Sequence, residues 1–224
     1  MRNKSIIISF CLSILSASAV WAQKPFPKEH SLGVNGGVVL SKMTFQPQTI
    51  VQDFRMGPTF GITYRYIEEK YFGIQAELLF TQRGWKDKLE DYPDLYFERS
   101  LNYVEMPILS HIFFGNDRVR GFVNLGPKFA FFLGDAKKGN IPPTIEGIET
   151  AHHSLEVTKK FDYGITGGAG IELRFGRNSI LLEGRYYFGL GDIFPNEKKD
   201  VFEASSNQNI AVTATYLFHI KRKK

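Results

Sequence analysis

Ionisable side chains recur at alternate positions of several aromatic-rich segments in this 224-residue chain. Successive side chains of a β-strand point to opposite faces, so charges at this spacing would share one face. The predicted set on that face holds acids and bases in equal number: Glu77, Glu105, Asp162, Glu172 and Glu183 against Arg65, Arg83, Lys128, Arg174 and Arg185. Such a set can form structural ion pairs, or it can line a polar path for small ions or protons.

Other residue patterns that could carry chemistry are weak. His152 and His153 stand near several glutamates, but no further ligand has the spacing of a metal site. His111 follows Ser110, and no ordered Ser, His and Asp set with a recognisable spacing accompanies them. The sequence therefore predicts no catalytic, metal-binding or cofactor-binding residue.

The elements that would position the charged set are eight segments of alternating polarity. They cover residues 31–40, 59–66, 72–84, 101–114, 119–133, 161–175, 179–190 and 209–219. In the sixth segment Tyr163 and Ile165 share an apolar face, whereas Asp162 and Glu172 share the opposite face. We expect the apolar faces to meet lipid and the polar faces to line a lumen.

The breaks between these segments alternate in length. Residues 67–71, 115–118 and 176–178 form short turns, whereas residues 41–56, 85–100, 134–160 and 191–208 form long loops. Outer-membrane barrels combine an even strand number with short periplasmic turns and longer external loops. The sequence therefore predicts an all-β fold, an eight-stranded antiparallel up-and-down transmembrane barrel with both termini in the periplasm of a Gram-negative bacterium.

The N-terminus has the pattern of a cleaved signal peptide. Arg2 and Lys4 precede an apolar run that is shorter than a spanning helix, and small residues lead to Ala22. Cys11 lies inside this run, so the mature chain would contain no thiol. The predicted organisation is a signal peptide over 1–22, a short periplasmic segment over 23–30, the barrel over 31–219 and a basic tail over 220–224.

Composition supports the barrel and excludes a nucleic-acid partner. Loss of Arg2 and Lys4 lowers the net charge from +5 to +3, and the remaining basic residues are scattered apart from the C-terminal tail. Twenty Phe and ten Tyr accompany a slightly negative mean hydropathy. This combination is natural for a barrel with an apolar outer wall and a polar lumen.

Six ordered blocks carry a resemblance to a known family. They are LGVNGGVVLS (32–41), IQAELLFTQRGW (74–85), NYVEMPIL (102–109), FVNLGPKFAFFLG (122–134), DYGITGGAGIEL (162–173) and LLEGRYYFGLGDIF (181–194). Together they resemble the PorT-family outer-membrane barrel domain common in Bacteroidota. The resemblance implies an eight-stranded outer-membrane barrel without catalytic residues, and one branch of the family serves type IX protein secretion. The final strand of an outer-membrane barrel usually ends on an aromatic residue that the barrel insertion machinery reads. The candidate here is Phe218, and this chain departs from the rule because residues 219–224 follow it.

The charged set and the loops lead to three functional hypotheses. The favoured one is a closed barrel whose charges pair inside the lumen, because eight strands leave an interior only just wide enough for side chains. Its external loops would contact lipopolysaccharide, envelope proteins or the surroundings, through Trp85, Asp87, Tyr92, Tyr96, Phe97 and Arg99 in the second long loop. The alternatives are a narrow channel or secretion accessory, and a membrane-embedded lipid hydrolase or acyltransferase.

Overall fold

The computed structural model describes residues 28–46, 52–87, 92, 94–141, 153, 155–192 and 204–222. The strands are β1 (Glu29–Gln46), β2 (Gln52–Asp53), β3 (Arg55–Ile67), β4 (Phe72–Asp87), β5 (Phe97–Gly115), β6 (Val119–Gly139), β7 (Phe161–Phe175), β8 (Asn178–Asp192) and β9 (Ala204–Arg222). No helix in this part of the chain is long and apolar enough to cross a membrane. The predicted signal peptide, Cys11 and His152 lie outside the described residues.

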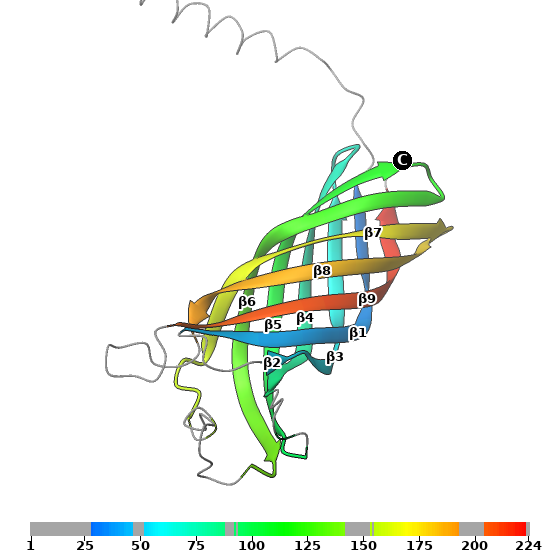
Figure 1. Ribbon diagram of the computed structural model, residues 1–224. Coiled ribbons are helices and arrows are strands. Elements are labelled where there is room, and N and C mark those ends of the chain that lie inside the picture. Colours follow the sequence, from blue (N-terminus) through cyan, green and yellow to red (C-terminus); the bar gives the residue numbers. More distant parts are fainter. Residues whose placement is uncertain are drawn as a thin grey trace, which may run out of the picture.

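The eight long strands form one closed antiparallel barrel (Figure 1). Each pairs with its neighbour in the sequence, β1 pairs with β9, and the β4–β5 pairing completes the ring. The two-residue strand β2 adds to the outer end of β4 through Gln52 and Asp53. The predicted eight-stranded barrel is therefore confirmed, with β2 as an addition that the sequence pattern did not indicate.

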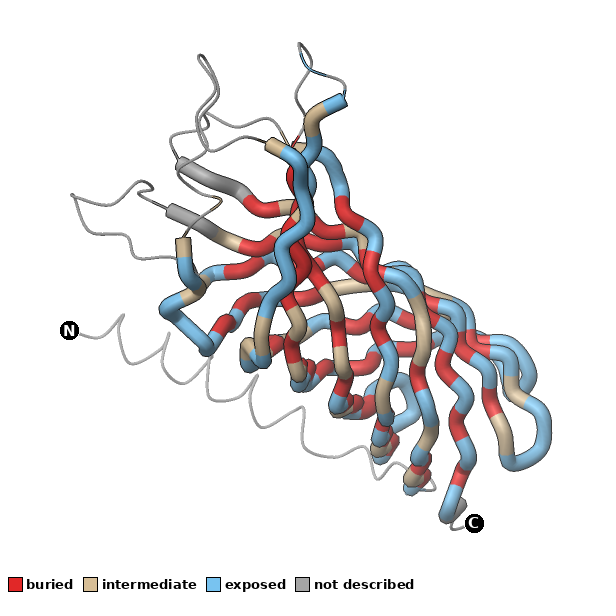
Figure 2. The backbone as a smooth tube through the Cα atoms, turned by 90° about the horizontal axis from the view of Figure 1, so that it is seen from below, coloured by how far each residue is buried: buried red, intermediate tan, exposed pale blue. Residues whose placement is uncertain are grey.

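Burial alternates along the strands (Figure 2). In β7, Tyr163, Ile165 and Ile171 are exposed on the outer wall, whereas Asp162 and Glu172 are buried inside. The same exposure of large apolar side chains recurs on the other long strands. An apolar outer wall around a polar interior is the arrangement that a lipid environment favours.

The short turns and the strand termini lie at one end of the barrel. The turns at 68–71, 116–118 and 176–177 gather there with the start of β1 and the end of β9 (Figure 1). Gly176 in the third turn has φ of +63°, a left-handed conformation that glycine adopts without strain. By the rule for outer-membrane barrels this is the periplasmic end, and the opposite end is extracellular.

The predicted barrel limits of 31 and 219 are too narrow. β1 begins at Glu29 and β9 ends at Arg222, and these two residues are register partners. Glu29 is buried inside the barrel. The short periplasmic segment predicted over 23–30 and the tail predicted over 220–224 therefore each contribute residues to the terminal strands.

The predicted second loop, 85–100, is also too long. β4 and β5 continue into it, with Lys86 opposite Glu98 and Asp87 opposite Phe97. Here Trp85 and Phe97 point inward and Lys86 points outward, which reverses the polarity seen in the membrane. Beyond the lipid the outer wall of the barrel meets water, so the apolar side chains point inward there. The alternation of apolar outer residues therefore stops before the strands themselves end.

Candidate functional site

The charged interior begins near the periplasmic end with two linked ion pairs. Arg65 from β3 makes a bidentate contact with Glu172 from β7, at 2.6 Å and 3.2 Å, and both side chains are fully buried. Arg174 donates a hydrogen bond to Glu29 across the interior at 2.6 Å. A planar guanidinium matches a carboxylate in this way, and the paired geometry offsets the loss of hydration.

A second group lies midway along the barrel. Arg185 from β8 contacts Glu77 from β4 at 2.7 Å and 3.0 Å, and it also contacts Glu183 at 2.7 Å. Asn124 donates a hydrogen bond to Glu183, and Gln75 donates one to Glu77. One cation therefore serves two carboxylates, and neutral amides supply further donors to them.

The third group lies toward the extracellular end. Arg83 from β4 lies 2.8 Å from Glu105 and 3.0 Å from Asp162, which come from β5 and β7. Lys128 from β6 lies 3.0 Å from the same Glu105. All four side chains are nearly inaccessible to solvent. The group holds two cations and two carboxylates, so it is electrically balanced.

Two buried tyrosines flank this third group. The Arg83 guanidinium lies 4.1 Å from the ring centre of Tyr103 and 5.2 Å from that of Tyr187. The Lys128 ammonium lies 3.6 Å from the Tyr187 ring. Aromatic faces attract cations in a dry interior, so these rings both fill the lumen and stabilise its positive charges.

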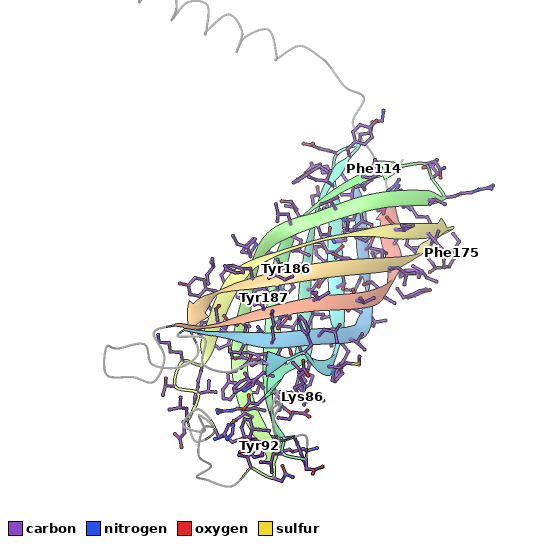
Figure 3. The ribbon with its side chains drawn as sticks, in the orientation of Figure 1. Lys86, Tyr92, Phe114, Phe175, Tyr186 and Tyr187 are labelled. Carbon is purple, nitrogen blue, oxygen red and sulfur yellow. The ribbon has the colours of Figure 1, made fainter. Side chains whose placement is uncertain are left out.

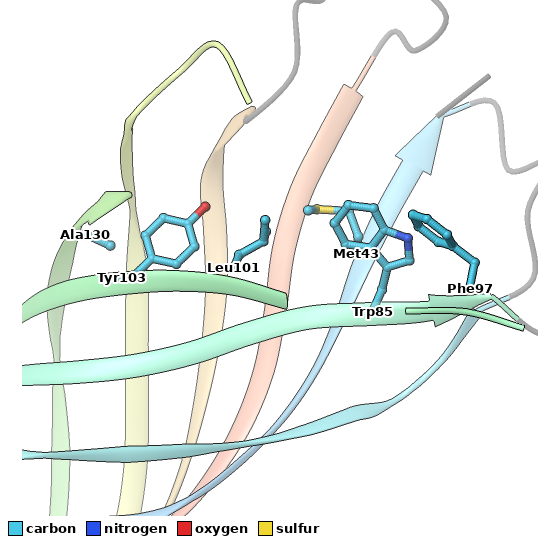
Figure 4. Close-up of a cluster of buried hydrophobic side chains, with 6 residues drawn as sticks. All are labelled: Met43, Trp85, Phe97, Leu101, Tyr103 and Ala130. Atoms are coloured by element: carbon cyan, nitrogen blue, oxygen red, sulfur yellow. The ribbon is translucent and has the colours of Figure 1, made fainter. Parts of the chain in front are cut away.

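Two apolar layers also fill the interior. The outer layer contains Met43, Trp85, Phe97, Leu101, Tyr103 and Ala130, which Figure 4 shows projecting from several strands toward one region. The inner layer contains Ile67, Phe113, Phe122, Leu181 and Leu217. The outer layer lies toward the extracellular end, and the inner layer lies at the level of the periplasmic charges, because Ile67 is the register partner of Glu29 and Leu181 is that of Glu172.

The structure thus brings together all ten residues of the predicted charged set. Each contacts an opposite charge, and some of the pairs cross the lumen between strands far apart in the sequence, such as Glu77 with Arg185. Sequence reasoning missed Glu29, because the first strand was expected to begin at Ser31. Strand parity extended back by two residues would have found it.

A further interior group surrounds His219 at the periplasmic end. Ser179 lies 2.8 Å from its Nε2, whereas Ser31 at 2.7 Å and Glu29 at 3.0 Å approach its Nδ1. A serine, a histidine and a carboxylate in this order resemble the array of a serine hydrolase. Ser179 is fully buried, however, and Ser31 competes for the nitrogen that would face the carboxylate. The contacts join β1, β8 and β9 where these strands meet.

The extracellular end corrects the predicted contact surface. Trp85, Asp87, Phe97 and Arg99 are buried rather than displayed. Arg99 contacts Asp135 at 2.7 Å and donates a hydrogen bond to the Leu155 carbonyl. Tyr92 and Tyr96 remain exposed, and Figure 3 shows Tyr92 at this end, opposite Phe114 and Phe175. These four buried side chains pack inside the outer ends of β4 and β5. Of the six residues predicted as a contact surface, only Tyr92 and Tyr96 therefore remain as contact candidates.

His153, which the sequence suggests only weakly as a metal ligand, contacts the outer ends of two strands. Its Nε2 lies 2.7 Å from Asp87, and its ring stacks on Phe97 with centroids 3.7 Å apart. Among the described residues no three His, Cys, Asp or Glu side chains gather as they would around a metal ion. His153 packs the chain against the outer ends of β4 and β5.

A small cavity remains between the second and third charged groups. Its volume is about 20 Å³, and Thr59, Glu105, Lys128 and Arg185 are among the residues that line it. One water molecule needs roughly 10–15 Å³ when volume is measured by probe centres. The cavity therefore has room for about one water among polar partners.

The comparisons with known proteins agree with this geometry. Residues 21–195 match the model of a family described as outer membrane protein beta-barrel domain. The chain belongs to this family. It is accordingly an outer-membrane protein, and lipid and lipopolysaccharide form the surroundings of its barrel. A search of curated protein sequences finds no match.

Solved structures of outer-membrane barrels are similar to this family member. OprG of Pseudomonas aeruginosa is 9% identical and has a TM-score of 0.53, with 88% of this chain and 97% of OprG covered. Ail of Yersinia pestis is 14% identical, with 85% and 99% coverage and a TM-score of 0.41. Neisserial surface protein A is 10% identical, with 82% and 95% coverage and a TM-score of 0.43. At this level of identity, the likeness to OprG shows the fold alone.

Proposed function

We propose that the protein is a closed outer-membrane barrel whose interior charges are a structural plug, and whose extracellular end makes its functional contacts. The observation that carries the proposal is the pairing of the charged interior. In all three groups the cations contact carboxylates on other strands, and the outermost group also packs against aromatic rings. Hydrogen-bonded pairs of this kind fix strand positions and leave little charge to attract a mobile ion.

The neutralising change Glu183→Gln tests the structural role of the plug. The amide keeps the shape of the side chain but weakens the hydrogen bonds from Arg185, which retains Glu77 as a partner. We expect the free energy of unfolding to fall by about 1–3 kcal/mol, while conductance stays at the background level. Urea unfolding followed by gel mobility measures the first quantity, and bilayer recordings measure the second. An altered current without any loss of stability would contradict the plug.

The functional contacts are proposed to lie on the exposed extracellular tyrosines. Tyr92 and Tyr96 are each about half exposed beyond the end of the charged interior. Tyrosine suits such contacts because it offers apolar area and a polar tip at a small entropic cost. The contact chemistry is that of a lipopolysaccharide surface or of another envelope protein.

Replacing both tyrosines by serine tests this surface. We expect Tyr92→Ser with Tyr96→Ser to abolish a specific crosslinked product on intact cells, while the barrel still assembles. Tyr71→Ser is the control, because Tyr71 is also about half exposed but lies at the opposite end. Crosslinking followed by mass spectrometry measures the effect. The same crosslinked product from the double variant and the wild type would contradict the assignment.

A narrow channel is the second candidate function. The cavity of about 20 Å³ beside Glu105, Lys128 and Arg185 favours this function. An ion-conducting path consists of successive polar sites, and a water site with polar walls could be one of them. Liposome permeability to small ions distinguishes the two candidates. A channel would dissipate an ion gradient, whereas a plugged barrel would maintain it.

We also propose that the protein is a PorT-type barrel of the kind found in Bacteroidota. The support for this assignment is the ordered set of sequence blocks, and the assignment implies an accessory role in protein secretion as one alternative. Comparison of secreted proteins between a deletion strain and its parent tests that role. Loss of a defined set of secreted proteins would support it, and an identical set would exclude it.

The proposed function includes no enzymatic activity. Ser179 has a histidine partner but is fully buried among side chains, so a lipid or peptide bond has no approach to its hydroxyl. The prediction is that lipid A from a deletion strain has the same mass spectrum as lipid A from its parent. A lost or added acyl chain in the deletion strain would instead indicate a hydrolase or acyltransferase.

A further inference from the structure

A second cavity opens at the periplasmic end of the barrel. Its volume is about 420 Å³, and it lies between the turn that joins β3 to β4 and the turn that joins β5 to β6. Lys70, Tyr71, Phe114, Asn116 and Arg120 are among the residues that line it. Figure 3 shows Phe114 at this end of the barrel. The cavity is large enough for a small anion or a lipid headgroup.

Arg120 is the group that points to a ligand. It is only 7% exposed, and its guanidinium packs 4.7 Å from the ring centre of Phe113. Among the described residues its polar contacts are long: 3.4 Å from Nε to the Asn116 carbonyl and 3.9 Å from Nη2 to Asp117. A guanidinium has five N–H donors, and buried arginines normally have close carboxylate partners.

The neighbouring interior carboxylates are engaged by other cations at shorter distances. Arg65 and Arg174 occupy Glu172 and Glu29 at distances of 2.6 Å. Two cations are therefore matched with two carboxylates, and Arg120 is a third cation in the same end of the barrel. Its nearest carboxylate, Asp117, is 88% exposed, where solvent screens the attraction.

Lys70 adds a second positive charge at the mouth of this cavity. Its ammonium lies 5.0 Å from the ring centre of Tyr71, and it forms no ion pair with a described residue. Lys70 and Arg120 face one carboxylate, that of Asp117, so the lining of the cavity carries an excess of one positive charge. Two donors of this kind around an open volume are suited to one anionic group.

We propose that the periplasmic cavity binds one phosphate group between Arg120 and Lys70. The planar fork of Arg120 would hold two phosphate oxygens, and Lys70 would act as a point charge on the same group. The group can come from inorganic phosphate or from the headgroup of an anionic phospholipid in the inner leaflet. Phe114, 60% exposed beside the cavity, offers apolar surface to the acyl chains in the second case.

Binding to the purified full-length barrel in an uncharged detergent tests the proposal. Native mass spectrometry with short-chain phosphatidylglycerol should show one bound lipid at low salt. Arg120→Gln and Lys70→Gln should each weaken this binding by about tenfold or more, since each removes a charge-assisted contact. Arg118→Gln is the matched control, because Arg118 is exposed in the same turn but does not line the cavity. We expect the control to change the affinity less than about twofold.

Inorganic phosphate, added as a competitor, distinguishes the two sources. Displacement of the lipid at millimolar phosphate supports a site for the free anion, and lipid binding that resists phosphate supports a headgroup site. Two results would overturn the proposal: no binding of either probe, or equal weakening by Arg118→Gln and Arg120→Gln, which would indicate only a generally basic rim. Heat-modifiable gel migration verifies folding of each variant, and the exposed Lys70→Gln keeps the test decisive if Arg120→Gln fails to fold.

Discussion

Replacement of Arg83 by Met is expected to lower the free energy of unfolding by about 3–5 kcal/mol, the cost of leaving buried charges without a partner. Arg83 lies between Glu105 and Asp162 and packs against Tyr103. Methionine fills much of the same volume, so the loss comes from the two carboxylates rather than from a void. Lys128 can serve Glu105, whereas Asp162 would lose its cation and keep a neutral hydrogen bond from Asn207. Urea titration with detection of the folded band on unheated gels measures the change.

The matched control for this prediction is Arg118→Met in an exposed periplasmic turn. It removes the same charge where water compensates for it, and we expect a change within about 0.5 kcal/mol. If Arg83→Met were as mild as this control, the interior carboxylates would have to be solvated or protonated already. That result would contradict the paired interior.

The second large effect is expected from the pair formed by Arg65 and Glu172. Both side chains are fully buried, so Arg65→Met alone leaves the Glu172 carboxylate with Arg174 at 3.9 Å, and we expect a loss of about 3–5 kcal/mol. The double variant Arg65→Met with Glu172→Leu removes both charges and leaves Arg174 paired with Glu29. It should therefore be more stable than Arg65→Met alone.

A double-mutant cycle on the same unfolding assay measures this coupling. We expect an interaction energy of about 2–3 kcal/mol, at the upper end for residues in direct contact. Additive losses from the two single variants would show that the charges do not stabilise one another. The control pair is Lys28 with Glu68, which is exposed and should show a coupling below about 1 kcal/mol.

Strand parity explains why much of this structure could be predicted from the sequence. Within the lipid, one face of each strand must be apolar and the other must fill a narrow lumen, so residues such as Ile165 and Asp162 fall on opposite sides. The same rule fails at Trp85 and Phe97, because the strands continue past the lipid and their polarity reverses there. Prediction of the strand ends outside the membrane therefore requires knowledge of the paired strands as well as the pattern of polar and apolar residues.

Partner choice across the lumen could not be predicted from the sequence. Parity places Glu77 and Arg185 inside, but their meeting depends on the tilt and stagger of strands four positions apart around the ring. Arg120 illustrates the same limit. It has interior parity like the paired arginines, yet its distances show that close carboxylates are already engaged by Arg65 and Arg174.

The conductance of single barrels in a planar lipid bilayer tests the closed, paired interior most directly. Three charged groups and two apolar layers predict a current that stays at the bilayer background in concentrated KCl across applied voltages. Brief transients without a defined level would agree with that prediction. A steady, ion-selective conductance that Glu183→Gln alters would contradict it and would establish the lumen as a path for ions.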